Sequence, residues 1–158
     1  MPEWGGQSKS VHIDKNAGIG WSTCPEFAIW LLNIIQYRYG YILDNLELKD
    51  EANKHFEKQV LKYVEENRLN TLNTTMGLTS FFLAGIYAYT GEHEKAYELL
   101  YDMEKKGTID IFFRNMSVDP YYQSLWDDEV FKAIILQKEK KYVEIRAEVD
   151  QLEKEGKL

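Results

Sequence analysis

FFLAGIYAYTGEHEKAYELL, residues 81–100, contains the spacing that decides the fold. Ala84 and Ala96 are twelve residues apart, and Leu100 follows the second alanine by four. Small residues allow two helices to cross closely, and a bulky residue one turn further on fills the gap beside the crossing. Gly91 lies between the two alanines and is suited to a tight turn. The stretch therefore predicts a hairpin of two packed helices.

The same spacing occurs earlier in the chain. Gly40 and Ala52 are also twelve residues apart, and Phe56 follows Ala52 by four. Leu43 and Tyr87 each lie three residues after the first small residue of their copy. The sequence therefore predicts two successive helical hairpins, at about 25–68 and 77–107.

The two copies resemble the tetratricopeptide repeat, whose pattern is W-x₂-L-G-x₂-Y…A-x₃-F…P. The matching elements are Tyr39-Gly40-x₂-Leu43 with Ala52-x₃-Phe56, and Leu83-Ala84-x₂-Tyr87 with Ala96-x₃-Leu100. Gln36 and Ser80 stand at the tryptophan position, and neither copy has the closing proline. The resemblance implies an α-α superhelix of two degenerate repeats. A generic helical bundle whose small residues coincide by chance is the alternative.

The rest of the chain completes an all-α prediction. Residues 1–21 have no period and are expected to be an irregular lead-in, after which residues 22–158 form one domain. Residues 108–127 contain Asp119-Pro120 and scattered aromatic residues, and are interpreted as an irregular capping loop. Residues 128–155 are expected to form a long final helix.

A second resemblance lies at the capping segment. Asp119-Pro120-Tyr121-Tyr122-x₂-Leu125-x-Asp127-Asp128-x₂-Phe131 is similar to a segment that often closes tetratricopeptide regions of bacterial multidomain signalling proteins. Glu129-Val130 replaces the usual Pro-Arg before the phenylalanine. The resemblance implies a capping element and suggests that the chain is part of a larger bacterial signalling protein.

Composition limits the function classes. The 158 residues are 44% apolar and 14% aromatic, which suffices for one ordered domain, and the net charge of −7 disfavours nucleic acid. A single cysteine and the lack of an apolar leader favour a cytoplasmic protein. The longest apolar run, AIWLLNII, is too short to cross a bilayer, so no membrane insertion is expected.

Catalytic and metal-binding signals are weak. The three histidines form no metal-ligand motif, so we expect no metal and no cofactor. Cys24 lies at a helix start, where its pKa could be lowered, but no histidine is near it in sequence. We therefore expect a protein that is not an enzyme, with an enzyme whose site is not visible in the sequence as the distant alternative.

The tetratricopeptide resemblance implies a concave groove for a protein or peptide partner. Some members grip a C-terminal carboxylate there with lysine and asparagine, whereas this chain has Tyr37 and Tyr41, which favours an apolar or proline-containing segment. The alternative is that the protein's own lead-in or Trp126 fills the groove. The predicted groove residues are Tyr37, Tyr41, Asp44, Asn45, Phe81, Gly85, Ala88 and Tyr89. The expected function is a non-catalytic interaction or regulatory scaffold.

The final helix offers another function. Its apolar stripe repeats at steps of four and three, as in a coiled coil, through Phe131, Ile135, Lys138, Tyr142, Ile145, Val149 and Leu152. The first two of these residues are expected to cap the repeats. The last four extend beyond what two repeats can cover, which predicts a contact with another copy or another domain. A structural module that forms homodimers through this helix is therefore the alternative function.

Overall fold

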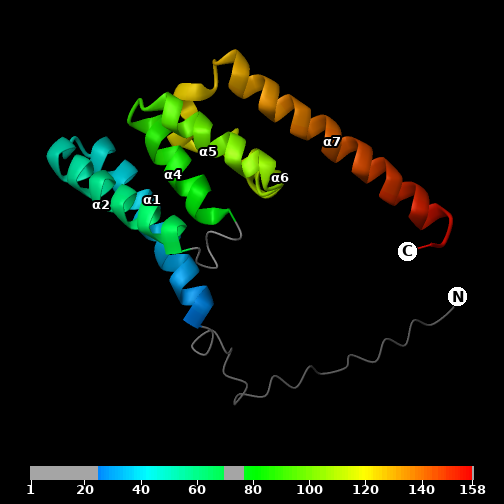
Figure 1. The fold of residues 1–158 in the computed structure, drawn as a ribbon, viewed down its shortest axis with the longest axis horizontal. Helices are drawn as coiled ribbons and strands as arrows, with labels where there is room; N and C mark the ends of the chain where they lie inside the picture. The colour runs from blue at the N-terminus through cyan, green and yellow to red at the C-terminus, as the bar shows by residue number, and fades with distance from the viewer. Residues whose placement is uncertain (1–24, 70–76, 158) are drawn as a thin grey trace, which may run out of the picture. The chain divides into compact units, whose positions relative to one another are not determined.

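A computed structural model describes residues 25–69 and 77–157, and every regular element within these ranges is helical, which confirms the all-α prediction for them. The elements are α1 (Pro25–Asn45), α2 (Lys49–Leu69), α4 (Leu78–Tyr89), α5 (His93–Lys105), α6 (Ile109–Met116), the 3₁₀ helix η2 (Pro120–Leu125) and α7 (Glu129–Lys154) (Figure 1). The predicted lead-in and the polar connector before α4 lie outside the described residues. The chain divides into two units, 1–35 and 36–158, and the contacts described below belong to the second.

The first hairpin brings α1 and α2 together at a glycine. A β-carbon at Gly40 would overlap the Phe56 ring, with Cδ1 only 2.8 Å away. Ala52 is fully buried and Phe56 nearly so. The small residue and the bulky residue of the first copy therefore meet where the sequence predicts a close crossing.

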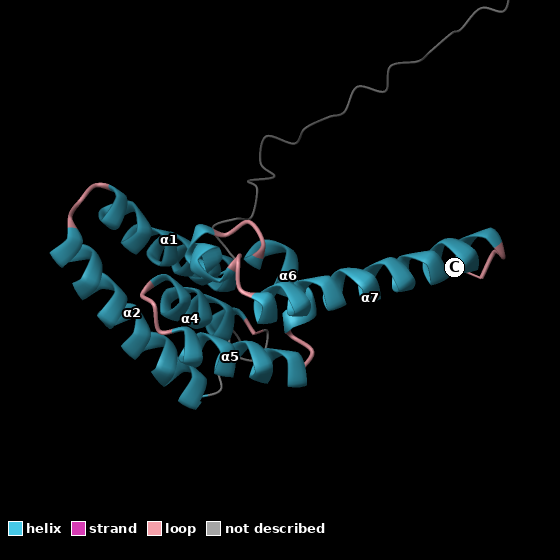
Figure 2. Ribbon diagram, turned by 90° about the horizontal axis from the view of Figure 1, so that it is seen from above, coloured by secondary structure: helices cyan, strands magenta, loops and turns pink. Residues whose placement is uncertain are grey.

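The second hairpin consists of α4 and α5, and α4 lies at the centre of the second unit. Ten of the twelve residues of α4 are buried, because α2, α5, α6 and η2 all pack against this helix (Figure 2). Ala84, Ala96 and Leu100 are fully buried. The spacing that predicted the hairpin thus corresponds to its packing positions.

Several of the helices are followed by a residue whose backbone has a positive φ, in the left-handed region. Gly91 follows α4 with φ 84°, and the amide of Glu92 then donates to the carbonyl of Tyr87, which closes the turn. Gly107 ends α5 in the same way, with φ 73°. The turn between α1 and α2 has Glu47 at φ 61° instead, a conformation that costs a non-glycine residue free energy.

The capping segment is more regular than predicted. Residues 108–127 were expected to be an irregular loop, and this is wrong, because they form the helix α6 and the 3₁₀ helix η2. The first helix buries Ile109, Phe112, Phe113 and Met116, which are spaced three, one and three residues apart along one helical face. Asp119 caps η2 by accepting a hydrogen bond from the Tyr121 amide, and Pro120 takes the first helical position.

The last helix, α7, is packed over its first half only. Asp128 caps it by accepting hydrogen bonds from the amides of Val130 and Phe131. Its buried residues are Phe131, Ile134 and Lys138, so Ile134 and not the predicted Ile135 points to the core, while Ile135 is half-buried. From Glu139 onward every described residue is exposed.

A lysine within the apolar stripe of α7 has a structural explanation. The Lys138 ammonium group lies 3.1 Å from Glu104 Oε1 of α5 and 3.2 Å from Asp110 Oδ1 of α6. Burial lowers the pKa of Lys138, but the two carboxylates outweigh this effect and raise it. The buried lysine therefore joins three helices.

Candidate functional site

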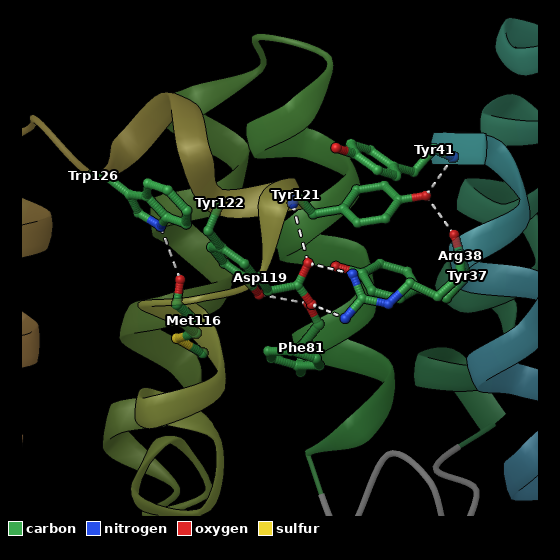
Figure 3. A network of polar contacts seen from close by, with 9 residues as sticks. All are labelled: Tyr37, Arg38, Tyr41, Phe81, Met116, Asp119, Tyr121, Tyr122 and Trp126. Atoms are coloured by element: carbon green, nitrogen blue, oxygen red, sulfur yellow. Dashed lines mark hydrogen bonds and ion pairs between the residues drawn. The ribbon is translucent and has the colours of Figure 1, made fainter. Parts of the chain in front are cut away.

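Several of the predicted groove residues of α1 and α4 lie against η2. The Tyr121 ring stacks on the Tyr37 ring, with centroids 4.1 Å apart (Figure 3). The Tyr122 hydroxyl donates to the carbonyl oxygen of Phe81 at 2.6 Å, and its ring stacks on the Phe81 ring at 5.5 Å. Two adjacent tyrosines of η2 thus each bind one of the helices that the resemblance assigns to the groove.

The Tyr121 hydroxyl lies within the backbone ladder of α1. It donates to the carbonyl oxygen of Tyr37 and accepts a hydrogen bond of 3.0 Å from the amide of Tyr41 (Figure 3). An undisturbed α-helix pairs these same two backbone groups, four residues apart. A side chain inserted into this ladder is a recognised cause of helix bending.

An ion pair fixes the start of η2 to α1. Both terminal nitrogens of Arg38 donate to the Asp119 carboxylate, at 2.8 and 3.0 Å. The Asp119 side chain is almost fully buried, whereas the Arg38 side chain is 41% exposed. Burial raises the pKa of Asp119, and it outweighs the Tyr121 amide and the Arg38 guanidinium, which both lower it.

Four of the predicted groove residues are covered as a result. Tyr37, Phe81, Gly85 and Ala88 are buried, and a β-carbon at Gly85 would collide with the Tyr37 hydroxyl. No partner can reach these four while η2 is in place. The sequence predicts Trp126 or the lead-in as the alternative occupant of this surface.

The segment that covers these four residues is η2. Trp126 turns away, and its indole nitrogen donates to the carbonyl oxygen of Met116 at 3.1 Å. Its ring borders an apolar cleft of about 350 Å³ with Phe131, Ile135 and Leu136. The lead-in itself lies outside the described residues.

The other four predicted residues form an accessible group, here called the tyrosine edge: Tyr41, Asp44, Asn45 and Tyr89. The rings of Tyr41 and Tyr89 meet edge to face, with centroids 5.7 Å apart. The Tyr89 hydroxyl donates to Asp44 Oδ2, and Lys49 donates to Asp44 Oδ1 at 2.6 Å. The structure therefore brings these residues of α1 and α4 together at one end of the two hairpins.

Ionisation at the tyrosine edge follows from these contacts. Hydrogen bonds from Lys49 and Tyr89 lower the pKa of Asp44, so this carboxylate is charged at neutral pH. Burial, and then the hydrogen bond to the Asp44 carboxylate, raise the pKa of Tyr89 well above its ordinary value. The edge thus presents two neutral aromatic rings beside a charged carboxylate, with Tyr41 half-buried and Asn45 exposed.

Sequence reasoning missed the residues that occupy the groove. Tyr121 and Tyr122 were read only as part of a capping segment, and Arg38 was not singled out. The available signal was the pair of adjacent aromatic residues after Asp119-Pro120, because a proline-started turn with two rings needs an apolar surface to cover.

The residues predicted for an oligomer contact lie on the exposed half of α7. Tyr142 is partly covered by α6, where the Arg114 guanidinium lies 3.9 Å from its ring centroid. Ile145 is half exposed and borders a small cleft with Asp110 and Phe113 of α6. Val149 and Leu152 are exposed, and the last turns of α7 extend past α6 (Figure 1). Tyr142 and Ile145 therefore lie beside α6, whereas Val149 and Leu152 lie beyond it.

Metal-binding clusters and membrane-spanning helices are both absent from the described residues. No group of three or more histidine, cysteine or acidic side chains in that part of the chain is arranged to hold a metal ion. None of the helices described there is long and apolar enough to span a membrane. Cys24, the one residue considered for nucleophilic chemistry, lies outside the described ranges.

Comparisons of the chain with protein-family profiles, with curated proteins and with solved structures find no match.

Proposed function

We propose that this chain is a tetratricopeptide-like scaffold that binds a protein or peptide partner and has no catalytic role. Two hairpins with the same packing positions support the repeat interpretation: Gly40 against Phe56 in the first, and buried Ala84, Ala96 and Leu100 in the second. Repeats of this kind commonly serve as binding surfaces.

The tyrosine edge is the observation that carries the proposal. Tyr41 and Tyr89 offer ring surface for an apolar or proline-containing segment, and the Asp44 carboxylate can accept a hydrogen bond from a partner's backbone or basic side chain. Because Tyr89 is already hydrogen-bonded to Asp44 and packed on Tyr41, little side-chain freedom is lost on binding.

The biological setting we propose comes from the resemblance of the capping segment. The Asp-Pro-Tyr-Tyr pattern favours a domain of a larger bacterial signalling protein that acts in the cytoplasm. In that setting the domain would regulate its parent protein by binding a partner segment. Nucleic acid is an unsuitable ligand for a chain with a net charge of −7.

A displayed library of random peptides tests the binding function. We expect the whole chain to enrich peptides with apolar or proline-containing cores, and the double substitution Tyr41→Ala, Tyr89→Ala to lose them. Tyr101→Ala is the control, because Tyr101 is an exposed tyrosine on α5 that lies outside the tyrosine edge. Peptides retained equally by all three proteins would exclude the tyrosine edge as the binding site.

Homo-oligomerisation through α7 is a second proposed function. One observation favours it: Ile145, Val149 and Leu152 are spaced four and three residues apart and are exposed. Apolar side chains in a continuous row are typical of interaction surfaces. Sedimentation of the whole chain over a range of concentrations tests this function directly.

A further inference from the structure

Two helices of the second unit carry exposed apolar rows with coiled-coil spacing. The first row is Tyr39 and Ile42 on α1 with Leu46, which directly follows the helix and donates its amide to the carbonyl of Ile42; these residues are 48, 50 and 64% exposed. On α7 the row is Ile145, Val149 and Leu152, which are 50, 39 and 37% exposed. Steps of three and four residues place each row on one face of its helix, as in the seam of a coiled coil.

The charges beside the α7 row disfavour pairing with a second α7. In a parallel pair, the residues that flank the seam would place Lys141 against the second copy's Arg146, and Glu148 against its Glu153. In an antiparallel pair with Ile145 opposite the second copy's Val149, Arg146 would face the second copy's Arg146. Glu148 would likewise face the second copy's Glu148. Like charges in these positions destabilise a helix pair.

The charges beside the α1 row suit α7 better. The residues that flank the α1 row are Gln36, Arg38 and Asn45, which are neutral or positive, and Leu43, which is buried in the hairpin. In an antiparallel pair with Ile42 opposite the second copy's Val149, Arg38 lies level with its Glu155. In the same pair, Asn45 lies level with the second copy's Glu148, and Gln36 lies level with its Glu153. No like charges therefore face each other.

We infer that the exposed end of α7 in one copy binds α1 of a second copy, through the rows Ile145–Val149–Leu152 and Tyr39–Ile42–Leu46. This inference rests on the homo-oligomerisation function and names the surface that α7 uses. The contact is heterologous, because two different surfaces of the same chain meet. Six apolar side chains form a small interface, typical of weak and reversible association.

Complementation between two variants tests the inference with the whole chain. Ile42→Glu inactivates the α1 row and Val149→Glu inactivates the α7 row, because each places a charge in an apolar seam. We expect each variant alone to associate at least about tenfold more weakly than the unsubstituted chain, as measured by sedimentation between about 1 µM and 1 mM. An equimolar mixture should associate again, since each pair then retains one intact contact.

Leu61→Glu is the control, because Leu61 is 73% exposed on α2 and lies outside both rows. It should associate like the unsubstituted chain, and circular dichroism should show that all variants keep their helix content. A chain that stays monomeric throughout overturns both the inference and the homo-oligomerisation function. Association that only Val149→Glu abolishes indicates α7 self-pairing and overturns the inference alone. A mixture that remains monomeric also overturns it.

Discussion

The hydroxyl of Tyr121 donates to the backbone carbonyl of Tyr37, while the rings of the two residues stack with centroids 4.1 Å apart. The two residues are 84 positions apart in the chain, so this contact joins the last part of the capping segment to the first hairpin. Both side chains are buried. The stability of the second unit should therefore depend on this one hydroxyl group.

Tyr121→Phe tests that dependence. The substitution keeps the ring but removes both hydrogen bonds to α1, and we expect it to lower the free energy of unfolding by about 1–3 kcal/mol. Tyr101→Phe is the control, because the exposed Tyr101 should change stability by less than about 0.5 kcal/mol. Urea unfolding followed by circular dichroism measures both. Equal stability of the two variants would show that the hydroxyl contributes nothing.

The two hairpins have different pairs of small and bulky residues at equivalent positions of the helix crossing. The first uses Gly40 with Phe56, and the second uses Ala84 with Leu100. Gly40→Ala should lower the free energy of unfolding by about 1–3 kcal/mol, because the new β-carbon overlaps the Phe56 ring.

A second substitution shows whether that overlap is the cause. Adding Phe56→Leu to Gly40→Ala reproduces the pair of the second hairpin and should restore most of the lost stability. The two substitutions would then be strongly non-additive in thermal unfolding. Additive losses would mean that the ring is not what excludes a side chain at position 40.

Asp119 should give the protein an unusual pH dependence. Because burial raises its pKa above the ordinary 3.8, the folded protein binds more protons than the unfolded chain between these two values. The stability that Asp119 contributes therefore falls as the pH rises through this interval. We expect the stability advantage of the unsubstituted chain over Asp119→Asn to shrink as the pH rises above about 4.

Asp110 provides the opposite case. Its pKa is lowered, chiefly by the hydrogen bond from Lys141 and also by Lys138. Its stabilising contribution is present above the ordinary pKa of 3.8 and is lost as the pH falls. The advantage over Asp110→Asn should thus shrink between about pH 5 and pH 3. Parallel pH curves for the two asparagine variants would contradict both assignments.

Glu47 is a site where a substitution should stabilise the protein. Its φ of 61° is left-handed, and glycine occupies the corresponding turns after α4 and α5. Glu47→Gly should raise the free energy of unfolding by about 0.5–1 kcal/mol, since the relief of strain exceeds the added freedom of the unfolded chain. Glu51→Gly, within α2, should lower it by about 1 kcal/mol instead. A loss in both would refute the strain argument.

The sequence predicted most of the local structure because that structure depends on short-range spacing. Small residues twelve positions apart located both hairpins, and Gly91 located a turn. The same reasoning overlooked α6, although Ile109, Phe112, Phe113 and Met116 follow a helical period, because the nearby Asp119-Pro120 and scattered aromatic residues suggested a loop.

The sequence could not predict which segment covers the predicted groove residues. Burial of Tyr37, Phe81, Gly85 and Ala88 depends on where η2 lies, and its contacts join residues about 40 to 84 positions apart. Spacing along a helix shows which residues share a face but not which distant segment covers that face. By itself the sequence determined the helices, their turns and their apolar faces, since these arise from local periodicity. Only the tertiary structure decided that two tyrosines of the capping segment cover four of the predicted groove residues and leave Tyr41 and Tyr89 half-buried, because such packing depends on the shapes of surfaces that meet across the fold.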